Sequence, residues 1–465
     1  MIVSTRGLVK LSMLLESENT AASQTGEFNK MRPFTPGLRY HAKFPGRIAA
    51  LGLLFLFATT TFAQEQSSAQ ALLSQADEVL QQMSEITGLP IKGQLGKQVV
   101  GRPEVERYLT QNLHQEMTPA ELHAQEALVR ALGLVSRDFN LEQFLISFYT
   151  EQAAGFYDPQ RKTMFIADWT PQESQSMVLS HELTHALQDQ NWDLESYLHG
   201  ARDNDDASAA RQAVVEGYAT AAMMQQAAGG LDLGQLPSIG PLIEQLIPQQ
   251  FAEFPAFSNA PQFFRTEALF PYLQGMGFIQ AGLQQGGWKD LNGLLSEHPP
   301  ETTKEIYEPQ IYYNHQALPQ VELSRPPALN GVGLRFLTAN SLGELGYYAM
   351  IQQLISEDEA KALGPAWMAD RYLLYEHSGG DEYTLVARTQ WATAAQAQAF
   401  FRDYRTILAN KYSDLTTSKR SSADEFIGAA GNGAVFLMRN GDQCMWAEGV
   451  PAAKSETMLE WLRAL

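Results

Sequence analysis

Cysteine is nearly absent from this sequence of 465 residues, which contains only Cys444. A single cysteine cannot form a disulfide within the chain, so no covalent cross-link stabilises the fold. Its position near the end of the chain also excludes a lipid anchor on a cysteine close to the N-terminus. The fold must depend on packing, and a hydrophobic share of 45% is enough to build sizeable cores.

Positive charge is scarce as well. The chain has 33 Lys and Arg residues against 52 Asp and Glu residues, which gives a formal charge of −19 at pH 7. A chain this acidic repels phosphate backbones and anionic lipid headgroups. We therefore expect neither nucleic acid nor a charged membrane surface as a partner.

Long hydrophobic runs are also missing. An apolar run at residues 48–58 follows several basic residues and precedes Ala63 in an A-x-A-like context, which is typical of a secretory signal. The run is shorter than the roughly 18 apolar residues that a membrane span usually needs, so a permanent anchor is the weaker alternative. We interpret residues 1–63 as a targeting segment and expect an exported protein, periplasmic or extracellular, without a stable membrane anchor after cleavage.

The targeting segment is unusually long, because signal cores seldom begin this far into a chain. Translation from Met31 would give the segment an ordinary length. Its basic residues outnumber its acidic ones, so cleavage after Ala63 makes the mature chain more acidic still.

Motifs for nucleotide binding and serine hydrolysis are missing too, since the sequence has neither a Gly-rich phosphate loop nor a G-x-S-x-G elbow. It does contain His181-Glu182-Leu183-Thr184-His185 on a predicted helix. Residues four apart lie on one helix face, so both imidazoles can reach one ion, and the Glu182 carboxylate can take a proton from a metal-bound water. This spacing indicates a metallopeptidase site with Glu182 as general base.

A catalytic zinc site normally has three protein ligands and one open position. Glu216 is the one acidic residue in an apolar, small-residue stretch of the next long helix, at 208–228, and a buried carboxylate needs a partner or a metal. We expect Glu216 to be the third ligand, with Gly217 and Ala219 letting its helix approach the histidine helix. The alternative is a solvent-facing Glu216 paired with Arg211.

With Glu216, the motif resembles the gluzincin group of zinc metallopeptidases, and it is similar in particular to exported bacterial gluzincin-like proteins of largely uncharacterised function. The resemblance covers roughly Ile91 to Trp391. The matching segments are EQAAGFYDP at 151–159, HELTHALQDQ at 181–190, FPYxxG at 270–275, GGW at 286–288 and PPETT at 299–303. The resemblance implies a zincin fold, peptidase activity and one Zn²⁺ per chain, held by His181, His185 and Glu216.

The sequence departs from the thermolysin-like pattern in two ways. Those enzymes have an aspartate four residues after the ligand glutamate that orients a ligand histidine, whereas this chain has Thr220 there. Asp189 is a candidate for this orienting role, although an exposed aspartate at the end of the helix is an alternative. The donor to the oxyanion of the tetrahedral intermediate is also unassigned, with His298, Tyr307 and Tyr313 as candidates and His298 as the one we select.

Periodicity and capping patterns predict an α+β fold. We expect a helix-rich zincin domain at 64–322, with a small hairpin or sheet before the active-site helix, and a smaller C-terminal α+β domain at 323–465. The predicted elements are a strand within 91–100, helices at 118–134 and 140–152, a hairpin at 155–167, a helix capped by Thr170, helices at 270–284 and 288–295, and, beyond 340, two strand pairs alternating with helices.

These predictions converge on an exported zinc endopeptidase that acts on peptide or protein substrates, with the second domain engaging substrate or partner. The alternative from another class is a catalytically idle, zinc-stabilised binding or assembly factor of the cell envelope. A third possibility is a zymogen in which residues 64–100 cover the cleft. Nothing in the sequence sets the oligomeric state or the side-chain preference.

Overall fold

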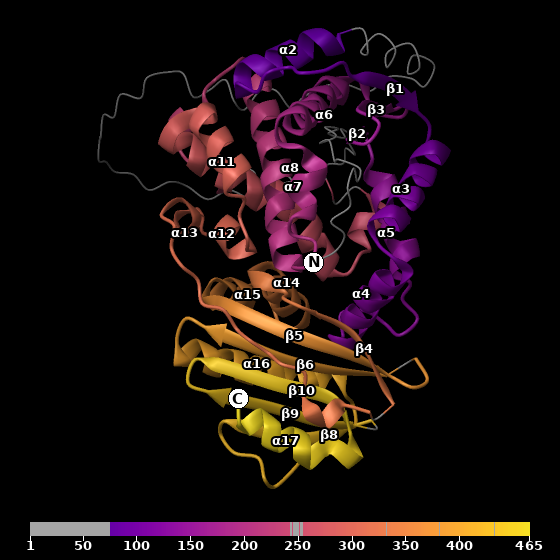
Figure 1. Ribbon diagram of the computed structural model, residues 1–465, viewed down its shortest axis with the longest axis vertical. Coiled ribbons are helices and arrows are strands. Elements are labelled where there is room, and N and C mark those ends of the chain that lie inside the picture. Colours follow the sequence, from indigo (N-terminus) through magenta and orange to yellow (C-terminus); the bar gives the residue numbers. More distant parts are fainter. Residues whose placement is uncertain are drawn as a thin grey trace, which may run out of the picture.

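A computed structural model of the chain describes residues 75–241, 244, 251, 254–331, 333–380, 382–431 and 433–465. The targeting segment predicted at 1–63, including the start at Met31, lies outside these residues. Within the described part of the chain, no helix is long and apolar enough to cross a membrane. The mixed α+β class is confirmed, with a helical half above a large sheet (Figure 1).

The first half of the chain is mainly helical. Its helices are α2 (Ala76–Thr87), α3 (Arg102–Glu116), α4 (Pro119–Ala131), α5 (Leu141–Gln152), α6 (Gln172–Trp192), α7 (Leu194–His199), α8 (Asp205–Ala227), α10 (Pro255–Ser258), α11 (Gln262–Glu297), α12 (Thr303–Tyr307) and α13 (Pro309–Tyr313). Side-chain caps fix several of their starts. Thr118 accepts a hydrogen bond from the backbone of Glu121 ahead of α4, and Asn140 does the same from Gln143 ahead of α5.

A three-stranded sheet precedes the histidine helix α6. It is ordered β1 (Gly96–Val100), β3 (Thr163–Ala167), β2 (Gly155–Asp158), with β1 and β3 parallel and β3 and β2 antiparallel. The hairpin predicted around the Asp-Pro turn is therefore confirmed. The cap predicted for α6 is wrong, because Pro171 occupies the N-cap position and the Thr170 hydroxyl donates instead to the carbonyl of Ala154 (2.7 Å).

Helices α6, α8 and α11 form the centre of this half. The closest approach is between α8 and α11, where a Cβ atom on Gly217 would lie 2.2 Å from the carbonyl carbon of Gly275. A Cβ on Gly275 would in turn lie 2.2 Å from the carbonyl oxygen of Ala213. The expectation that Gly217 faces the histidine helix is thus wrong, because this glycine packs against α11.

Helix α11 contains the two helices predicted at 270–284 and 288–295. They meet at Gly287, whose φ of 68° is non-helical and suits glycine. The two parts fold back on each other, since a Cβ atom on Gly282 would lie 2.6 Å from the Leu291 side chain.

The second half is built on a seven-stranded antiparallel sheet ordered β4-β5-β6-β10-β9-β8-β7. Its elements are β4 (Leu334–Asn340), α14 (Gly343–Leu354), α15 (Glu357–Leu363), β5 (Trp367–His377), β6 (Tyr383–Trp391), α16 (Ala394–Lys411), β7 (Thr416–Thr417), β8 (Glu425–Ala430), β9 (Gly433–Asn440), β10 (Gln443–Pro451) and α17 (Ser455–Arg463). The predicted strands and helices are present, and the prediction missed β4, β7 and β8.

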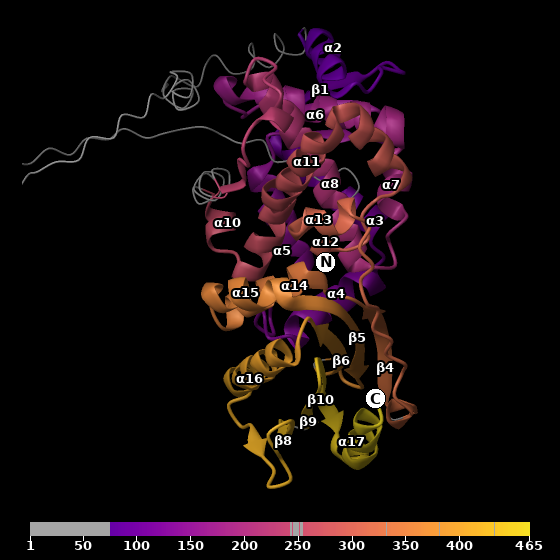
Figure 2. The same cartoon turned by 90° about the vertical axis from the view of Figure 1, so that its left-hand side faces the viewer.

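Helices cover both faces of this sheet, with α16 on one side and α17 on the other (Figure 2). The alternation along β5 shows why: Leu374 packs into the core with α16, and its neighbours Leu373 and Tyr375 pack into the core with α17. The core on the α16 side also includes residues of α4, α5 and α11, so this core spans the junction between the two halves.

The zymogen hypothesis concerned residues 64–100, of which 75–100 are described. Ala76, Leu80 and Met83 of α2 are buried in the core that contains α6 and α8. Strand β1 lies at the edge of the small sheet opposite β2. This part of the segment is therefore integral to the fold.

Candidate metal centre

His181 and His185 lie one turn apart near the middle of α6 and are almost completely buried. Their ring centroids are 4.7 Å apart, and their Nε2 atoms are separated by 3.1 Å. Two buried imidazoles this close repel each other when both are protonated, so the arrangement needs a shared proton or a shared cation.

Helix α8 brings a carboxylate to the same point. Glu216 is 2% exposed, and its Oε2 lies 3.2 Å from Nε2 of His181 and 3.6 Å from Nε2 of His185. A tetrahedral ion with ligand distances of about 2.0–2.1 Å has ligand atoms about 3.3 Å apart, which these separations match. The three residues form a group that can hold a metal ion, in agreement with the predicted ligand set.

The alternative for Glu216 is excluded by its surroundings. Arg211, the predicted solvent-face partner, donates to the backbone carbonyl of Tyr197 (2.8 Å). The second oxygen of Glu216, Oε1, accepts a hydrogen bond from Nε2 of Gln212 one turn earlier on α8 (2.8 Å). Gln212 thereby holds the carboxylate in place with Oε2 directed at the histidines.

Gln188 orients His185 from behind. Its Oε1 lies 2.5 Å from Nδ1 of His185, while its Nε2 donates to the backbone carbonyl of Val215 (3.0 Å). The bond to Val215 fixes which end of the amide faces the ring, so Nδ1 is the protonated nitrogen and Nε2 is left for the ion. Sequence reasoning missed this residue, although its position three after His185 places it on the same helix face.

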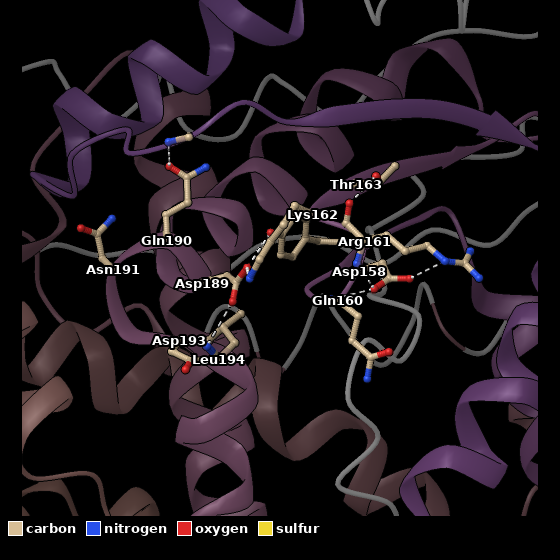
Figure 3. Close-up of polar contacts among 12 residues, drawn as sticks. Asp158, Gln160, Arg161, Lys162, Thr163, Asp189, Gln190, Asn191, Asp193 and Leu194 are labelled. Atoms are coloured by element: carbon tan, nitrogen blue, oxygen red, sulfur yellow. Dashed lines mark hydrogen bonds and ion pairs between the residues drawn. The ribbon is translucent and has the colours of Figure 1, made fainter.

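Asp189, the residue predicted to orient a histidine, has a different role (Figure 3). Its side chain is buried, and its Oδ2 accepts from the Tyr157 hydroxyl (2.6 Å) and from Nζ of Lys162 (2.7 Å). Burial and the Asp189 carboxylate raise the pKa of Tyr157, which keeps its hydroxyl a donor. Asp189 therefore ties the β2–β3 hairpin to α6, and both the orienting role and the exposed alternative are wrong.

The two residues after Asp189 hold the segment between α2 and β1. Oε1 of Gln190 accepts from the backbone nitrogens of Lys92 (2.6 Å) and Gly93 (3.1 Å). Asn191 donates to the carbonyl of Pro90 (2.9 Å). The four consecutive residues 188–191 of α6 thus hold His185, the β2–β3 hairpin and the segment between α2 and β1 in place.

Glu182 is buried beside the start of β2. A Cβ atom on Gly155 would lie 2.6 Å from a Val178 methyl group and 3.5 Å from Cγ of Glu182, so glycine is needed for the strand to cross α6 here. Strand β2 is an edge strand of the small sheet, and it runs next to Glu182, the predicted general base.

The three predicted oxyanion donors lie in different places. Tyr307 packs against Phe270 and Tyr348, and the Tyr313 hydroxyl donates to the carbonyl of Phe278 (3.1 Å). His298 is exposed at the end of α11, its carbonyl accepts from the Tyr312 hydroxyl, and the ligand group does not include it.

Another tyrosine lies next to the ligands. The ring of Tyr272 on α11 is 6.4 Å from the imidazole of His181, centroid to centroid. This residue belongs to the FPYxxG segment that carried part of the resemblance, and its proximity follows from the folding of α11 against α8. Sequence spacing alone gives no sign of it.

Comparison with known proteins bears only on the second half of the chain. A family model described as a domain of unknown function (DUF8575) matches residues 334–459, which form the seven-stranded sheet with α14, α15, α16 and part of α17. No curated protein and no solved structure matches the chain. The matched segment contains none of the three candidate ligands.

Proposed function

We propose that this protein is an exported zinc-dependent endopeptidase of the gluzincin type. The observation that carries the proposal is the convergence of Nε2 of His181, Nε2 of His185 and Oε2 of Glu216, which lie 3.1–3.6 Å apart. Two nitrogens and one oxygen at tetrahedral spacing suit Zn²⁺, which leaves a fourth position for water or substrate. When bound, zinc lowers the pKa of water from 15.7 to about 7 and polarises a carbonyl group.

Glu182 supplies the base. It follows His181 directly on α6, about 100° further around the helix axis, so its carboxylate adjoins the face that carries the two histidines. There it takes a proton from the attacking water and passes it to the leaving amine, which breaks the peptide bond.

Tyr272 replaces His298 as our candidate for the oxyanion donor. Its ring adjoins His181, so a phenol hydroxyl on this side of the ligand can reach an oxygen that develops negative charge in the transition state. The ring is only partly buried, which leaves it accessible to substrate.

The test is mass-spectrometric mapping of cuts in a diverse peptide library, using the protein from Gln64 onward and its Glu182→Gln variant at matched zinc content. We expect zinc-dependent cuts by the wild type and their loss in the variant, because glutamine cannot accept the proton. Equal cleavage by both proteins contradicts the proposal. The same is true if neither cuts, a result that favours the zinc-stabilised binding factor.

A further inference from the structure

Strand β4 forms one edge of the large sheet, where it pairs with β5 alone among the described strands. Six of its seven residues are at least partly exposed, whereas all four residues of β2, an edge of the small sheet, are buried. The opposite edge of the large sheet is β7, which has two residues. A long and accessible edge such as β4 is a template on which another extended chain can pair.

The backbone of Ala339 on β4 is directed away from β5. The nitrogen of His377 donates to the carbonyl of Glu382 (2.9 Å), on the β6 side, and residues two apart in a strand point the same way, so Leu373 also directs its N–H and C=O to β6. Ala339 lies opposite Leu373, and its own N–H and C=O therefore point to the free side. In agreement, its carbonyl accepts from the guanidinium group of Arg371 (3.1 Å).

A cavity of about 460 Å³ lies along this edge, between the two halves of the molecule. The four consecutive residues 337–340 line it. Leu337 packs against the core on the α16 side and Ala339 against the core on the α17 side, so the edge of the strand itself is in the wall of the cavity. The facing walls come from α4, the first turns of α8 and the middle of α11. The volume is within the roughly 300–1,000 Å³ of ligand sites in proteins.

The same cavity adjoins the metal centre. Pro271 lines it, and the next residue of α11, Tyr272, lies 6.4 Å from His181 between ring centroids. Gln212 lines it as well and donates to Oε1 of Glu216 (2.8 Å). A polypeptide that crosses the metal centre can therefore continue along β4.

We propose that an extended segment of the peptide substrate pairs with β4 as an additional strand, through the N–H and C=O of Ala339. The inference rests on the proposed function, and it names the class of substrate as polypeptides that are extended from the metal centre to β4. Main-chain hydrogen bonds to a sheet edge supply affinity whatever the side chains of the peptide. The Ala339 carbonyl has two lone pairs, so it can keep Arg371 and also accept a peptide N–H.

A β-bulge limits where the peptide can pair. The register between β4 and β5 shifts between Phe336 and Thr338, which divides the edge of β4 into two parts. The part after the bulge lines the cavity, and we place the pairing there. The matched domain of unknown function begins with this strand, so the inference gives that domain a role in holding the substrate.

Binding can be measured without turnover. The zinc-loaded Glu182→Gln protein is immobilised, and the retained part of the diverse peptide library is quantified by mass spectrometry. Adding Ala339→Pro removes the outward N–H, and edge strands tolerate proline at such positions, so we expect retention to fall at least about fivefold.

The matched control is Leu334→Pro on the same strand. The Gly333 carbonyl accepts from the nitrogen of Ser378 just after β5 (3.0 Å), so the next residue, Leu334, directs its N–H outward as Ala339 does. Leu334 lies outside the cavity wall, and we expect its replacement to leave retention unchanged.

Hydrogen exchange locates the pairing without any substitution in β4. We expect the amides of residues 334–340 in the zinc-loaded Glu182→Gln protein to exchange more slowly in the presence of the library, and those of β7 and β8 to exchange as before. This measurement decides the matter if Ala339→Pro fails to fold.

The cleavage map separates this inference from the proposed function. Cuts by the wild type, loss of retention in Ala339→Pro and protection of β4 together support both. Cuts whose yield Ala339→Pro leaves unchanged, with no protection of β4, overturn the pairing and leave the peptidase intact. Retention that depends on Ala339, without any cleavage, supports the pairing and overturns the peptidase. An equal loss of retention in Leu334→Pro and Ala339→Pro, without protection of β4, overturns the pairing.

Discussion

At the scale of single residues, His181, His185 and Glu216 form a group that can hold a metal ion, and Gln188 and Gln212 position two of these side chains. His181 and His185 follow from helix geometry, and Glu216 from the cost of burying a lone carboxylate. The role of Gln188 could not be predicted, because a glutamine three residues after a histidine on a helix is also common on a solvent-exposed face. Only the contact with Val215, on another helix, shows that its amide points at His185.

The role of Gln188 predicts an effect on metal affinity. Gln188→Leu removes the acceptor that fixes the His185 tautomer, so we expect zinc affinity to fall about 10- to 100-fold. Competition with a chromophoric chelator measures this. Gln190→Leu, two residues further along the same helix, is the control and should leave zinc affinity unchanged; an equal loss in both variants would mean that the effect is a general loosening of α6.

The position of Tyr272 beside His181 leads to a separate prediction about kcat. If its hydroxyl stabilises the oxyanion, Tyr272→Phe lowers kcat by about 10²- to 10³-fold while zinc content and KM stay close to those of the wild type. Tyr307→Phe and Tyr313→Phe are matched controls that lack this role in the structure. A loss in either control as large as that in Tyr272→Phe would count against the assignment.

At the scale of elements, local signals placed most helices and strands, and tertiary contacts decided the rest. Thr118 and Asn140 mark helix starts both in the sequence and in the structure. Strand β4 was missed because its residues are mostly half-buried and show no clean alternation. Whether Gly217 faces α6 or α11 depends on how these helices pack against α8. The spacing of residues along α8 alone does not determine it.

The anchoring of the β2–β3 hairpin by Asp189 predicts a loss of stability. Asp189→Ala leaves the buried Tyr157 hydroxyl without its acceptor and removes the partner of Lys162, so we expect the free energy of unfolding to fall by about 2–4 kcal/mol. Urea denaturation measures this loss in the free energy of unfolding. Glu106→Ala, at an exposed position of α3, should cost much less; a similar loss in both would show that the Asp189 contacts contribute little.

The integration of α2 and β1 predicts the outcome of an N-terminal truncation. Removing residues 64–100 exposes the apolar partners of Ala76, Leu80 and Met83 and deletes one strand of the small sheet. We expect a protein that unfolds at lower temperature than the full mature chain, or does not fold at all, and that has no added peptidase activity. A folded truncated protein with higher activity would instead establish the zymogen.

At the scale of the whole molecule, three buried carboxylates lie near the start of α14, where the two halves meet, and the pair Glu344–Lys304 joins them. Oδ1 of Asp206 on α8 accepts from the backbone and hydroxyl of Thr303, and Asp370 on β5 accepts from the backbone nitrogens of Leu342 and Gly343. Glu344 pairs with Lys304 (3.2 Å). Burial raises the pKa of Asp370 to about 7 and that of Glu344 to about 8.

These raised pKa values predict how stability depends on pH. The folded state keeps protons on Asp370 and Glu344 at pH values where the unfolded chain has lost them, so their contribution is full below about pH 4 and is lost as pH rises through 7 and 8. From pH 5 to pH 8 we expect the free energy of unfolding to fall by an amount on the order of 5 kcal/mol on their account. The slope of the urea midpoints across this range should be smaller in Asp370→Asn, where only Glu344 still contributes, and unchanged in the exposed control Asp358→Asn; the same slope in both variants contradicts the assignment.

The central claim is that His181, His185 and Glu216 hold one zinc ion. The most direct test is the metal content of the purified mature protein by mass spectrometry, compared with that of Glu216→Gln and His185→Ala, with the exposed His298→Ala as the control. We predict one zinc per chain in the wild type and in His298→Ala, and a large loss in the other two while their folds persist. Zinc retained in full by both ligand variants, or no zinc in the wild type after incubation with the ion, would contradict the account.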